Sequence, residues 1–493
     1  MRHLDLLAGP AGATPRALAV AGSGVHWSFA EVDDRTDRLG RALYGLGLTP
    51  GDRVALLAAN EPEYLEAQAA CLRWGFTLVP LNTRLADPEL LFILGDCDPR
   101  VLLVGRDQAG RVDALVPQTG IASAFVFGVD GSYEALLAAA PAEAPLPPDD
   151  PALLAVILYT SGTTGRPKGA MIDRQAFTAR VLVNCAELQV ARTDRHLAAL
   201  PMFHIAAFLA YAHTVVGGAI VMLPDFSPAR CLDVMLGEGI TTTVLVPTMI
   251  SMLLAHDGPR PDSLRLIVYG GSSIMPSVLA QAMTHFRSGM LQQYGMTESG
   301  AQTILRPADH DPDDRDKLSS AGTEAVSFEV RIVDDADRPL PSGGIGEIVC
   351  RAPSVMSGYW NRPEATAETL RGGWMHTGDV GYRDERGYLH ITDRRNDTII
   401  SGGENVYPRE VEAALLDHPG VTDLAVVGTT DPVWGEVVTA FVVEPAPTDE
   451  ELQAWARERL AGYKIPRRWV RVSDLPRNAT GKVLKHELRT GIG

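Results

Sequence analysis

Cysteine is scarce in this sequence and is never closely paired. The five cysteines, Cys71, Cys97, Cys185, Cys231 and Cys350, stand far apart, without a Cys-x-x-Cys spacing. Structural zinc sites and dithiol redox centres usually need such pairs, so the spacing argues against both classes of site. Scattered cysteines are typical of reduced thiols in a cytoplasmic protein, and we expect that location.

Positive charge and long apolar runs are also lacking. Lysine and arginine number 44 against 61 acidic residues, giving a formal charge of −17 without a basic stripe, which argues against a nucleic-acid binder. No segment approaches the ~18 apolar residues of a membrane span. Residues 1–20 contain Asp5 and lack the apolar core of a signal peptide. We therefore expect an intracellular protein with no nucleic-acid partner and no membrane span.

The 493 residues are too many for one core, so two or more domains are expected. Short apolar segments alternate with helical patterns, first over residues 25–150 and again over 218–292. This rhythm predicts an α/β fold with two helix-covered sheets of largely parallel strands. Strands are predicted at 53–58, 77–80, 101–104, 124–127, 218–223, 242–246, 264–269 and 290–292, and helices at 29–48 and 62–74.

The pattern changes toward the C-terminal end. From Phe328, short strands with turn signals predict a small β-rich, barrel-like subdomain over about residues 325–393. A helix at 406–421, a hairpin at 425–444 and a helix at 449–464 then predict a small α+β domain. The predicted division is a large N-terminal domain, 1–394, and a small mobile C-terminal domain, 395–493.

The most informative segment is YTSGTTGRPKGA, residues 159–170, which follows an apolar run at 153–158. Its hydroxyl side chains, glycines and Lys168 can wrap a phosphate chain with backbone N–H groups, hydroxyls and one ammonium. Pro167 and Gly169 flank the lysine, so this is not a Walker motif. Because most Gly/Ser/Thr-rich loops are only turns, the segment favours phosphate binding without establishing it.

Two further segments fit a nucleotide site. QQYGMTESG, residues 292–300, holds Tyr294, which could stack on a base, and Glu298, which could bind a hard divalent cation. YGGSSI, residues 269–274, ends an apolar strand with two glycines that let a flat ring approach the backbone. Each segment alone is also compatible with an ordinary strand end.

Two more segments lie farther along the chain. In WMHTGD, residues 374–379, Asp379 could accept hydrogen bonds from both hydroxyls of a ribose, although a lone aspartate in such a turn is more often a turn former. In PRNATGKVLK, residues 476–485, Lys482 stands in a Thr-Gly-Lys turn, although most terminal lysines are simply solvated.

In this order, the five segments resemble the adenylate-forming superfamily of acyl-CoA synthetases, luciferases and nonribosomal-peptide adenylation domains. PMFHIAAF at 201–208 and the run at 391–412 are similar to bacterial fatty-acyl and aryl-CoA ligases, and the resemblance covers essentially the whole chain. It implies that a carboxylic acid attacks the α-phosphate of ATP and expels pyrophosphate, after which coenzyme A captures the acyl-adenylate. The implied cofactors are ATP, Mg²⁺ and coenzyme A.

The resemblance also implies roles for the residues that match the family's motifs. Lys482 would stabilise negative charge on the reacting carboxylate and α-phosphate, and Thr164 with Glu298 would position Mg²⁺. The other expected ATP-site residues are Thr160, Ser161, Gly162, Thr163, Lys168, Ser272, Gln292, Gln293, Tyr294, Thr297, Asp379 and Arg394.

The small domain is implied to alternate between two orientations about Asn396, a position where the family usually carries Asp or Lys. Ser401, Gly402 and Gly403 would line the coenzyme A tunnel. His204 would act between the adenylate and the acyl or thiol path, with a purely structural histidine as the alternative. The expected acyl pocket comprises His204, Ala206, Ala207, Phe208, Thr248, Gly271, Ser273 and Gly295.

The leading interpretation is an acid–thiol ligase for a medium- or long-chain fatty acid or an aromatic acid. The acceptor is expected to be coenzyme A, because no carrier domain follows residue 493 and no sizeable insertion separates the two domains. A carrier protein or another nucleophile is the alternative acceptor. A catalytically dead scaffold is disfavoured because the expected charged site residues are all present. The acid and the oligomeric state stay open, with a homodimer common in the family.

Overall fold

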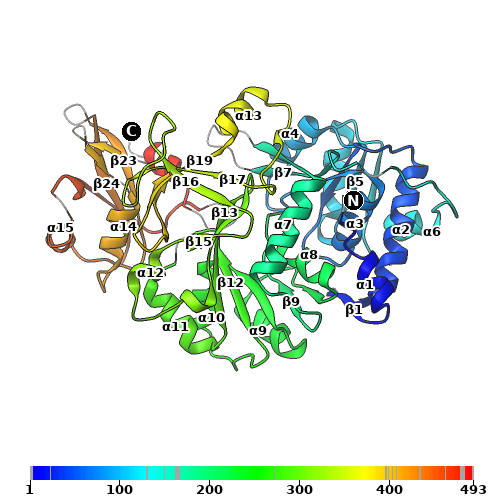
Figure 1. Cartoon of the computed structure of the whole chain (residues 1–493), viewed down its shortest axis with the longest axis horizontal. Coiled ribbons are helices and arrows are strands. Elements are labelled where there is room, and N and C mark those ends of the chain that lie inside the picture. Colours follow the sequence, from blue (N-terminus) through cyan, green and yellow to red (C-terminus); the bar gives the residue numbers. More distant parts are fainter. Residues whose placement is uncertain are drawn as a thin grey trace. The chain divides into compact units, whose positions relative to one another are not determined.

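The computed structural model describes residues 4–22, 24–128, 131–148, 150–160, 167–272, 274–394, 397, 399–401, 404–406, 408–431, 435–460, 462–477 and 483–490. The chain forms two compact units, Met1–Val330 with Cys350–Met375, and Arg331–Val349 with His376–Gly493 (Figure 1). The predicted boundary at residue 394 lies inside the second unit, so the domain extents 1–394 and 395–493 stay predictions.

The first sheet of the first unit has seven strands. They are β3 (Arg53–Leu57), β4 (Thr77–Pro80), β5 (Val101–Val104), β6 (Ser123–Val126), β7 (Leu154–Thr160), β8 (Lys168–Asp173) and β18 (Gly358–Tyr359). Their order is β18-β8-β7-β4-β3-β5-β6. The strands from β7 to β6 run parallel, whereas β8 and β18 pair antiparallel. The predicted parallel strands are confirmed here, because continuous apolar runs suit strands that are covered on both faces.

The second sheet of the first unit has nine strands. They are β1 (Leu18–Gly22), β2 (Val25–Ser28), β9 (Arg195–Ala198), β10 (Ala219–Met222), β11 (Thr242–Leu245), β12 (Leu266–Gly270), β13 (Gly289–Met296), β14 (Gly300–Leu305) and β15 (Thr323–Glu324). The order is β15-β14-β13-β12-β11-β9-β10-β1-β2, parallel from β13 to β1. The strand predicted at 290–292 is too short, because β13 pairs with β12 and β14 as far as Met296.

Helices connect and cover these strands. They are α1 (Ala8–Ala13), α2 (Phe29–Gly45), α3 (Glu63–Trp74), α4 (Asp87–Cys97), α5 (Val112–Leu115), α6 (Ser132–Ala138), α7 (Arg174–Glu187), α8 (Ala207–Val216), α9 (Pro228–Gly237), α10 (Pro247–Leu254), α11 (Pro276–Phe286), α12 (Arg315–Ser319) and α13 (Pro363–Thr369). Helix α2 starts where predicted, because Ser28 and Glu31 form a capping box, but it ends at Gly45, before Gly47 with φ +85°.

Helix α8 contributes side chains to the cores of both sheets. Its Phe208 belongs to the cluster that contains Val156 and Leu158 of the first sheet. Its Leu209 belongs to the cluster that contains Val268 of the second sheet. The helix therefore lies between the two sheets (Figure 1), and residues adjacent in its sequence face different layers.

The second unit contains two smaller sheets. One has the order β16-β17-β19-β20, formed by β16 (Glu329–Val333), β17 (Gly346–Arg351), β19 (Met375–Arg383) and β20 (Leu389–Arg394). The other is formed by β21 (Ile399–Ser401), β22 (Glu404–Val406), β23 (Leu424–Asp431), β24 (Gly435–Val443) and β25 (Arg468–Val472). The predicted 425–444 hairpin is confirmed as β23 and β24. Short strands are present after Phe328, but Cys350–Met375 belongs to the first unit, so the predicted barrel-like subdomain over 325–393 stays a prediction.

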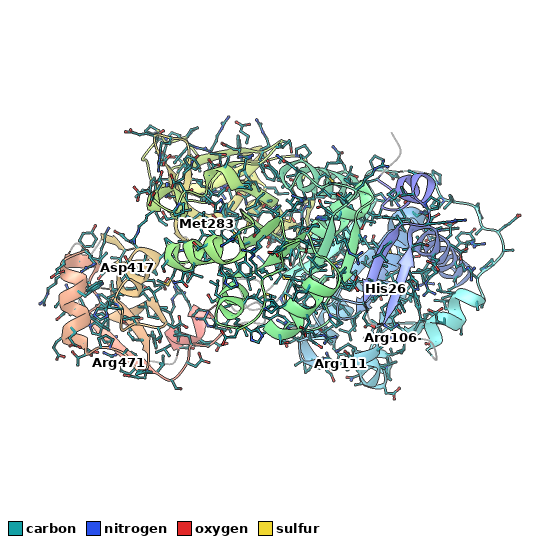
Figure 2. The ribbon with its side chains drawn as sticks, turned by 90° about the horizontal axis from the view of Figure 1, so that it is seen from below. His26, Arg106, Arg111, Met283, Asp417 and Arg471 are labelled. Atoms are coloured by element: carbon teal, nitrogen blue, oxygen red, sulfur yellow. The ribbon has the colours of Figure 1, made fainter. Side chains whose placement is uncertain are left out.

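Three helices complete the second unit, α14 (Pro408–Leu416), α15 (Asp449–Arg457) and α16 (Lys485–Thr490). The helix predicted at 449–464 ends earlier, at Arg457, and a separate 3₁₀ turn covers Gly462–Lys464. Arg471 of β25, labelled in Figure 2, donates from Nε to Asp449 Oδ1 at 3.1 Å and so ties the sheet to the start of α15. Across the described residues, every helix is too short or too polar to cross a membrane.

Candidate active site

The two ends of the predicted phosphate loop are held together as a hairpin. β7 ends at Thr160 and β8 begins at Lys168, and these two residues are direct partners in the antiparallel pair. Thr160 Oγ1 also donates to the Lys168 carbonyl at 3.5 Å. A Cβ on Gly169 would lie 2.7 Å from Ile157 Cγ2, so only glycine lets the strands approach this closely. Thr160 and Lys168 are thus brought together at the mouth of the loop.

Glu298 is positioned by a buried arginine that the sequence analysis did not identify. Arg180 of α7 donates to the carbonyls of Ser354 (2.8 Å), Thr297 (2.8 Å) and Glu298 (3.1 Å). Burial lowers the pKa of Arg180 to about 9, against the opposing effect of the Glu298 charge, so the guanidinium stays charged at neutral pH. Because the planar guanidinium donates to three carbonyls in a fixed geometry, Arg180 fixes the backbone of Glu298.

Tyr359 connects Glu298 with the phosphate loop, and it too was missed. Its phenol donates to Glu298 Oε1 at 2.8 Å, and Lys168 Nζ lies 5.3 Å from the centroid of its ring. Tyr359 and Glu298 are both buried, at 9% and 8% exposure. The sequence offered only an apolar GYW segment as a signal. Tertiary contact is what makes this tyrosine part of the site.

The fit of Mg²⁺ to this place rests on the chemistry of the donor. Glu298 offers hard carboxylate oxygens, which are the ligands that Mg²⁺ prefers in proteins. The backbone and side chain of Glu298 are both fixed, as a metal ligand requires. Thr164, the other expected ligand, lies outside the described residues, as do Ser161, Gly162 and Thr163.

The predicted adenine segments lie side by side at the end of two parallel strands. Gly270 of β12 is the partner of Gln293 of β13, and Tyr294 follows on the same strand. A Cβ on Gly270 would lie 2.4 Å from the Gln293 carbonyl oxygen, so glycine is required there. Gln293 Nε2 donates to Asn184 Oδ1 at 2.9 Å. Ligands of open α/β sheets bind at this end of the strands, which fits the predicted place for the base.

Some neighbouring predicted residues are described and others are not. Ser272 and Gly271 are exposed, and Gly271 has φ +80°, which favours glycine. Gln292 Oε1 is buried without a hydrogen-bond partner among the described residues, so it is available to a ligand or a water molecule. Ser273 lies outside the described residues.

His204 lies in the turn immediately before α8. It lines a cavity of about 10 Å³, large enough for one water molecule, together with Gln68, Phe208 and Tyr211. Burial and the nearby Arg84 charge lower the pKa of His204 to about 4, so the imidazole is neutral at pH 7. Gln68 Nε2 has no hydrogen-bond partner among the described residues and was not anticipated from the sequence.

The predicted acyl-pocket residues do not all share one wall. His204, Ala207 and Phe208 line the cavity on the side of the first sheet, whereas Ala206 packs into the core of the second sheet. Thr248 is exposed in the first turn of α10. Gly295 lies in β13, where a Cβ would be 1.9 Å from the Gly300 oxygen. Ala206 and Ala207 pack into different core clusters, because successive residues of a helix point about 100° apart.

In the second unit, Asp379 of β19 is the direct partner of Arg394 of β20. Asp379 is buried at 7% exposure, and its N–H donates to Thr377 Oγ1 at 3.0 Å. The register therefore brings the backbones of the two predicted ribose-binding residues together, while the Arg394 side chain is not described.

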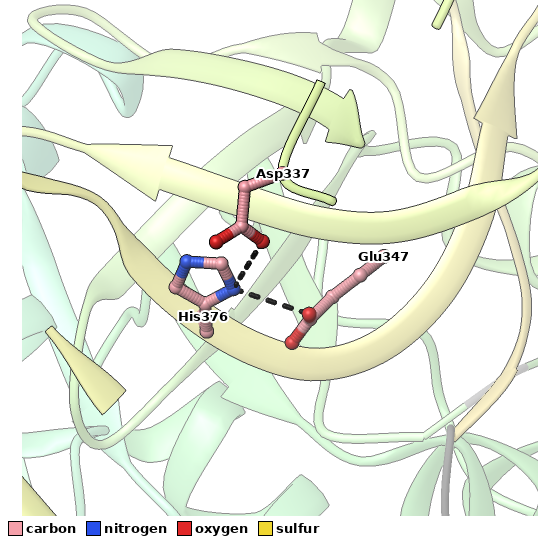
Figure 3. A group of neighbouring side chains, drawn as sticks. All are labelled: Asp337, Glu347 and His376. Atoms are coloured by element: carbon pink, nitrogen blue, oxygen red, sulfur yellow. Dashed lines mark hydrogen bonds and ion pairs between the residues drawn. The ribbon is translucent and has the colours of Figure 1, made fainter. Parts of the chain in front are cut away.

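Buried His376 and Glu347, together with exposed Asp337, lie beside the strand that carries Asp379 (Figure 3). His376 Nδ1 lies 3.1 Å from Glu347 Oε2 and 4.0 Å from Asp337 Oδ1. The other Glu347 oxygen accepts from Gly378 N–H at 3.2 Å, and Thr377 Oγ1 donates to the Ile348 carbonyl at 2.6 Å. These hydrogen bonds connect residues 376–378 of β19 to Glu347 and Ile348 of β17, immediately before Asp379.

The remaining predicted residues lie mainly outside the described part of the chain. Ser401 is buried at the end of β21 and is the partner of Glu404 in β22, and Gly402 and Gly403 between them are outside the described residues. Asn396 and Lys482 are outside them as well.

Comparison with known proteins gives the same picture over the whole length. The family model "AMP-binding enzyme" matches residues 8–360, and "AMP-binding enzyme C-terminal domain" matches residues 410–482. A feruloyl-CoA synthase of Amycolatopsis sp is 40% identical, over 97% of both chains. A 2-succinylbenzoate–CoA ligase of Bacillus velezensis is 39% identical, over 97% of this chain and 96% of the relative. A fatty acid–[acyl-carrier-protein] ligase, ScoC of Streptomyces coeruleorubidus, is 36% identical, over 96% and 93%.

Solved structures agree with these relatives. ATP-bound MatB from Rhodopseudomonas palustris superposes with a TM-score of 0.90 at 33% identity, covering 99% of both chains. The amide bond synthetase McbA from Marinactinospora thermotolerans superposes with a TM-score of 0.91 at 33% identity, again over 99% of both chains.

Proposed function

Because this chain belongs to the AMP-binding enzyme family of acyl- and aryl-CoA ligases, we propose that it activates an aromatic carboxylic acid as an acyl-adenylate and transfers the acyl group to coenzyme A. One observation carries the nucleotide half of the proposal. Lys168 and Glu298, far apart in the sequence, contact opposite parts of Tyr359. The Lys168 ammonium, suited to bind phosphates, and the Glu298 carboxylate, suited to bind Mg²⁺, therefore both contact the Tyr359 side chain.

In the first half-reaction, a carboxylate oxygen of the acid forms a bond to the α-phosphorus of ATP, and the bond from that phosphorus to the bridging oxygen of pyrophosphate breaks. Lys168 and the loop from Thr160 to Thr164 would bind the departing pyrophosphate. Mg²⁺ held by Glu298 and Thr164 would supply neutralisation of the phosphate charge. Lys482 would stabilise the charge that develops on the α-phosphate oxygens.

In the second half-reaction, the thiol sulfur forms a bond to the acyl carbon, the bond from that carbon to the AMP phosphate oxygen breaks, AMP leaves, and the thiol proton passes to solvent. Asp379 and Arg394 would hold the ribose in both steps, which their direct strand pairing supports. Asn396 would be the pivot between the two steps, and the turn from Ser401 to Gly403 would pass the pantetheine arm.

The names of the relatives favour an aromatic acid. A feruloyl-CoA synthase and a 2-succinylbenzoate–CoA ligase, both matched over nearly their full length, carry aromatic acyl groups in their names. ATP–pyrophosphate exchange across aromatic and short-, medium- and long-chain fatty acids tests this. Exchange that is fastest with a fatty acid would contradict the aromatic assignment, and no exchange with any acid would contradict the adenylation itself.

Two relatives use an acceptor other than coenzyme A. ScoC transfers to an acyl carrier protein and McbA forms amide bonds, by their names. The enzyme is incubated with ATP and the best acid, and then with coenzyme A, a phosphopantetheinylated carrier or an amine. The acceptor that is consumed identifies which of the three transfers the enzyme performs. Coenzyme A consumption equal to AMP release supports the proposal, and exchange without such consumption contradicts it.

Lys482 provides the test of the catalytic assignment. Lys482→Ala is expected to lose adenylation while keeping thiol transfer from preformed acyl-adenylate, because the ammonium serves the reacting α-phosphate only in the first step. A variant that adenylates normally would contradict the assigned role.

A further inference from the structure

We propose that Tyr359 is a positioning residue that couples Lys168 at the phosphate loop to the Glu298 carboxylate, so that cation and metal ligand are set at a fixed separation. The inference rests on the proposed function, in which these two side chains serve the phosphates and Mg²⁺. The proposal adds Tyr359, which lies on a different segment of the chain, and its loss should disturb the positions of Lys168 and Glu298 together.

The backbone of Tyr359 is anchored to the strand that begins with Lys168. Tyr359 is the antiparallel partner of Ala170 in β8, and Trp360 N–H donates to the Gly169 carbonyl at 2.8 Å. On its other side, Tyr359 N–H donates to Thr366 Oγ1 at 2.8 Å. The ring is therefore carried by a backbone that is bonded to β8 and to α13, and it moves with the end of the phosphate loop.

The backbone of Glu298 is anchored to the same segment. Met356 N–H donates to the Glu298 carbonyl at 2.7 Å, and Arg180 bonds the carbonyls of Ser354, Thr297 and Glu298. These bonds fix the main chain at residue 298. They leave the direction of the carboxylate to be set by its own partner, the Tyr359 phenol.

The two ends of the Tyr359 side chain suit opposite charges. The phenol O–H donates to the carboxylate at 2.8 Å. The Lys168 ammonium lies 5.3 Å from the ring centroid, within the range of a cation–π contact. One rigid side chain thus orients the anion through its hydroxyl and the cation through its ring.

Two substitutions at one position separate the two contacts. Tyr359→Phe keeps the ring near Lys168 and removes the donor to Glu298, so we expect the half-saturating Mg²⁺ concentration for ATP–pyrophosphate exchange to rise about tenfold. Tyr359→Leu removes the ring as well, so we expect ATP binding to weaken by about a further threefold. The KM for the acid should stay at the wild-type value in Tyr359→Phe.

The chain offers a matched control for the phenol–carboxylate bond. Tyr133 of α6 donates to the buried Glu66 of α3 at 2.8 Å in the same unit. Tyr133→Phe is expected to lower the urea midpoint without changing the Mg²⁺ dependence. A rise in half-saturating Mg²⁺ equal to that of Tyr359→Phe would show a general effect of stability and would overturn the coupling.

A double substitution distinguishes positioning from a merely structural role. In the Glu298→Gln background, Tyr359→Phe should cause no further change in Mg²⁺ dependence, because the carboxylate that it orients is already gone. Additive effects of the two substitutions would overturn the proposal.

Cation binding without turnover keeps the test independent of catalysis. Calorimetric titration of Mn²⁺ into the enzyme with a non-hydrolysable ATP analogue should show the same loss of affinity in Tyr359→Phe. Unchanged cation affinity in that variant would overturn the coupling even if the wild type catalyses exchange. Absence of exchange in the wild type would instead contradict the proposed function, while the calorimetric comparison would still decide the coupling.

Discussion

Two stacked histidines inside the first unit predict a loss of stability in mild acid. His213 of α8 and His196 of β9 are fully buried, and their rings stack with centroids 4.4 Å apart. His213 Nδ1 lies 2.7 Å from the Leu209 carbonyl, which requires an N–H there, so Nε2 accepts from Thr242 Oγ1 at 2.9 Å. Thr242 Oγ1 in turn accepts from His196 Nδ1 at 3.0 Å. Protonating His213 would turn Nε2 into a second donor facing the threonine O–H.

The size of the effect follows from the pKa of His213. Burial lowers that pKa from 6.5 to about 4, and burial with the neighbouring His213 charge also lowers the pKa of His196. Below pH 6.5 the unfolded chain binds a proton at His213 that the folded chain does not bind. The contribution of neutral His213 to the free energy of unfolding is therefore complete above pH 6.5 and is lost as the pH falls toward 4. Between about pH 7.5 and pH 5, His213 alone should account for a loss of about 2 kcal/mol in the free energy of unfolding.

The assay compares the wild type with His213→Gln, which cannot titrate. Urea unfolding at both pH values, followed by hydrogen exchange in the peptides of α8 and β9, reports on the first unit. We expect the variant to be less stable at neutral pH but to lose less stability on acidification, by about 2 kcal/mol. His256→Gln, at a half-buried histidine outside this network, should keep the wild-type pH dependence.

Comparing the two pH slopes cancels other titrating groups such as Glu66, whose pKa burial raises to about 7. If His213→Gln loses as much stability on acidification as the wild type, the assignment of the pH dependence to this histidine pair is refuted.

Three further predictions concern the candidate site. Arg180→Met removes three hydrogen bonds to backbone carbonyls, so urea unfolding should show a loss of about 3 kcal/mol in the free energy of unfolding. Exchange assays should show that the variant needs a higher Mg²⁺ concentration. An unchanged Mg²⁺ requirement would contradict the positioning of residue 298 by Arg180. Gly295→Ala places a Cβ against the Gly300 oxygen, so soluble yield and exchange should both fall, whereas a stable, active variant would contradict the described β13–β14 pairing. His376→Phe leaves Glu347 without its imidazole partner, so thermal unfolding of the second unit should reveal a loss of about 2 kcal/mol; Glu347→Gln in the same background should recover part of it, and no recovery would argue against the pair.

The fold was predictable from the sequence because its sheets are built from continuous apolar strands. The strands at 77–80 and 101–104 are found at the predicted bounds, because short, β-branched apolar runs suit parallel strands that are covered on both faces. The antiparallel edge strands β2 and β15 were not anticipated, because short or polar edge segments lack that signal.

The sequence by itself determined the family and the chemistry, since the glycine and hydroxyl pattern at 159–170 and the carboxylate at 298 are readable as local motifs. Tertiary structure decided how these parts are held. Tyr359 and Arg180 act through contacts with residues far along the chain, and Ala206 and Ala207, adjacent in sequence, face different layers. The physical reason is that a motif records which groups are available, whereas the distance and direction between them come from strand register and helix packing.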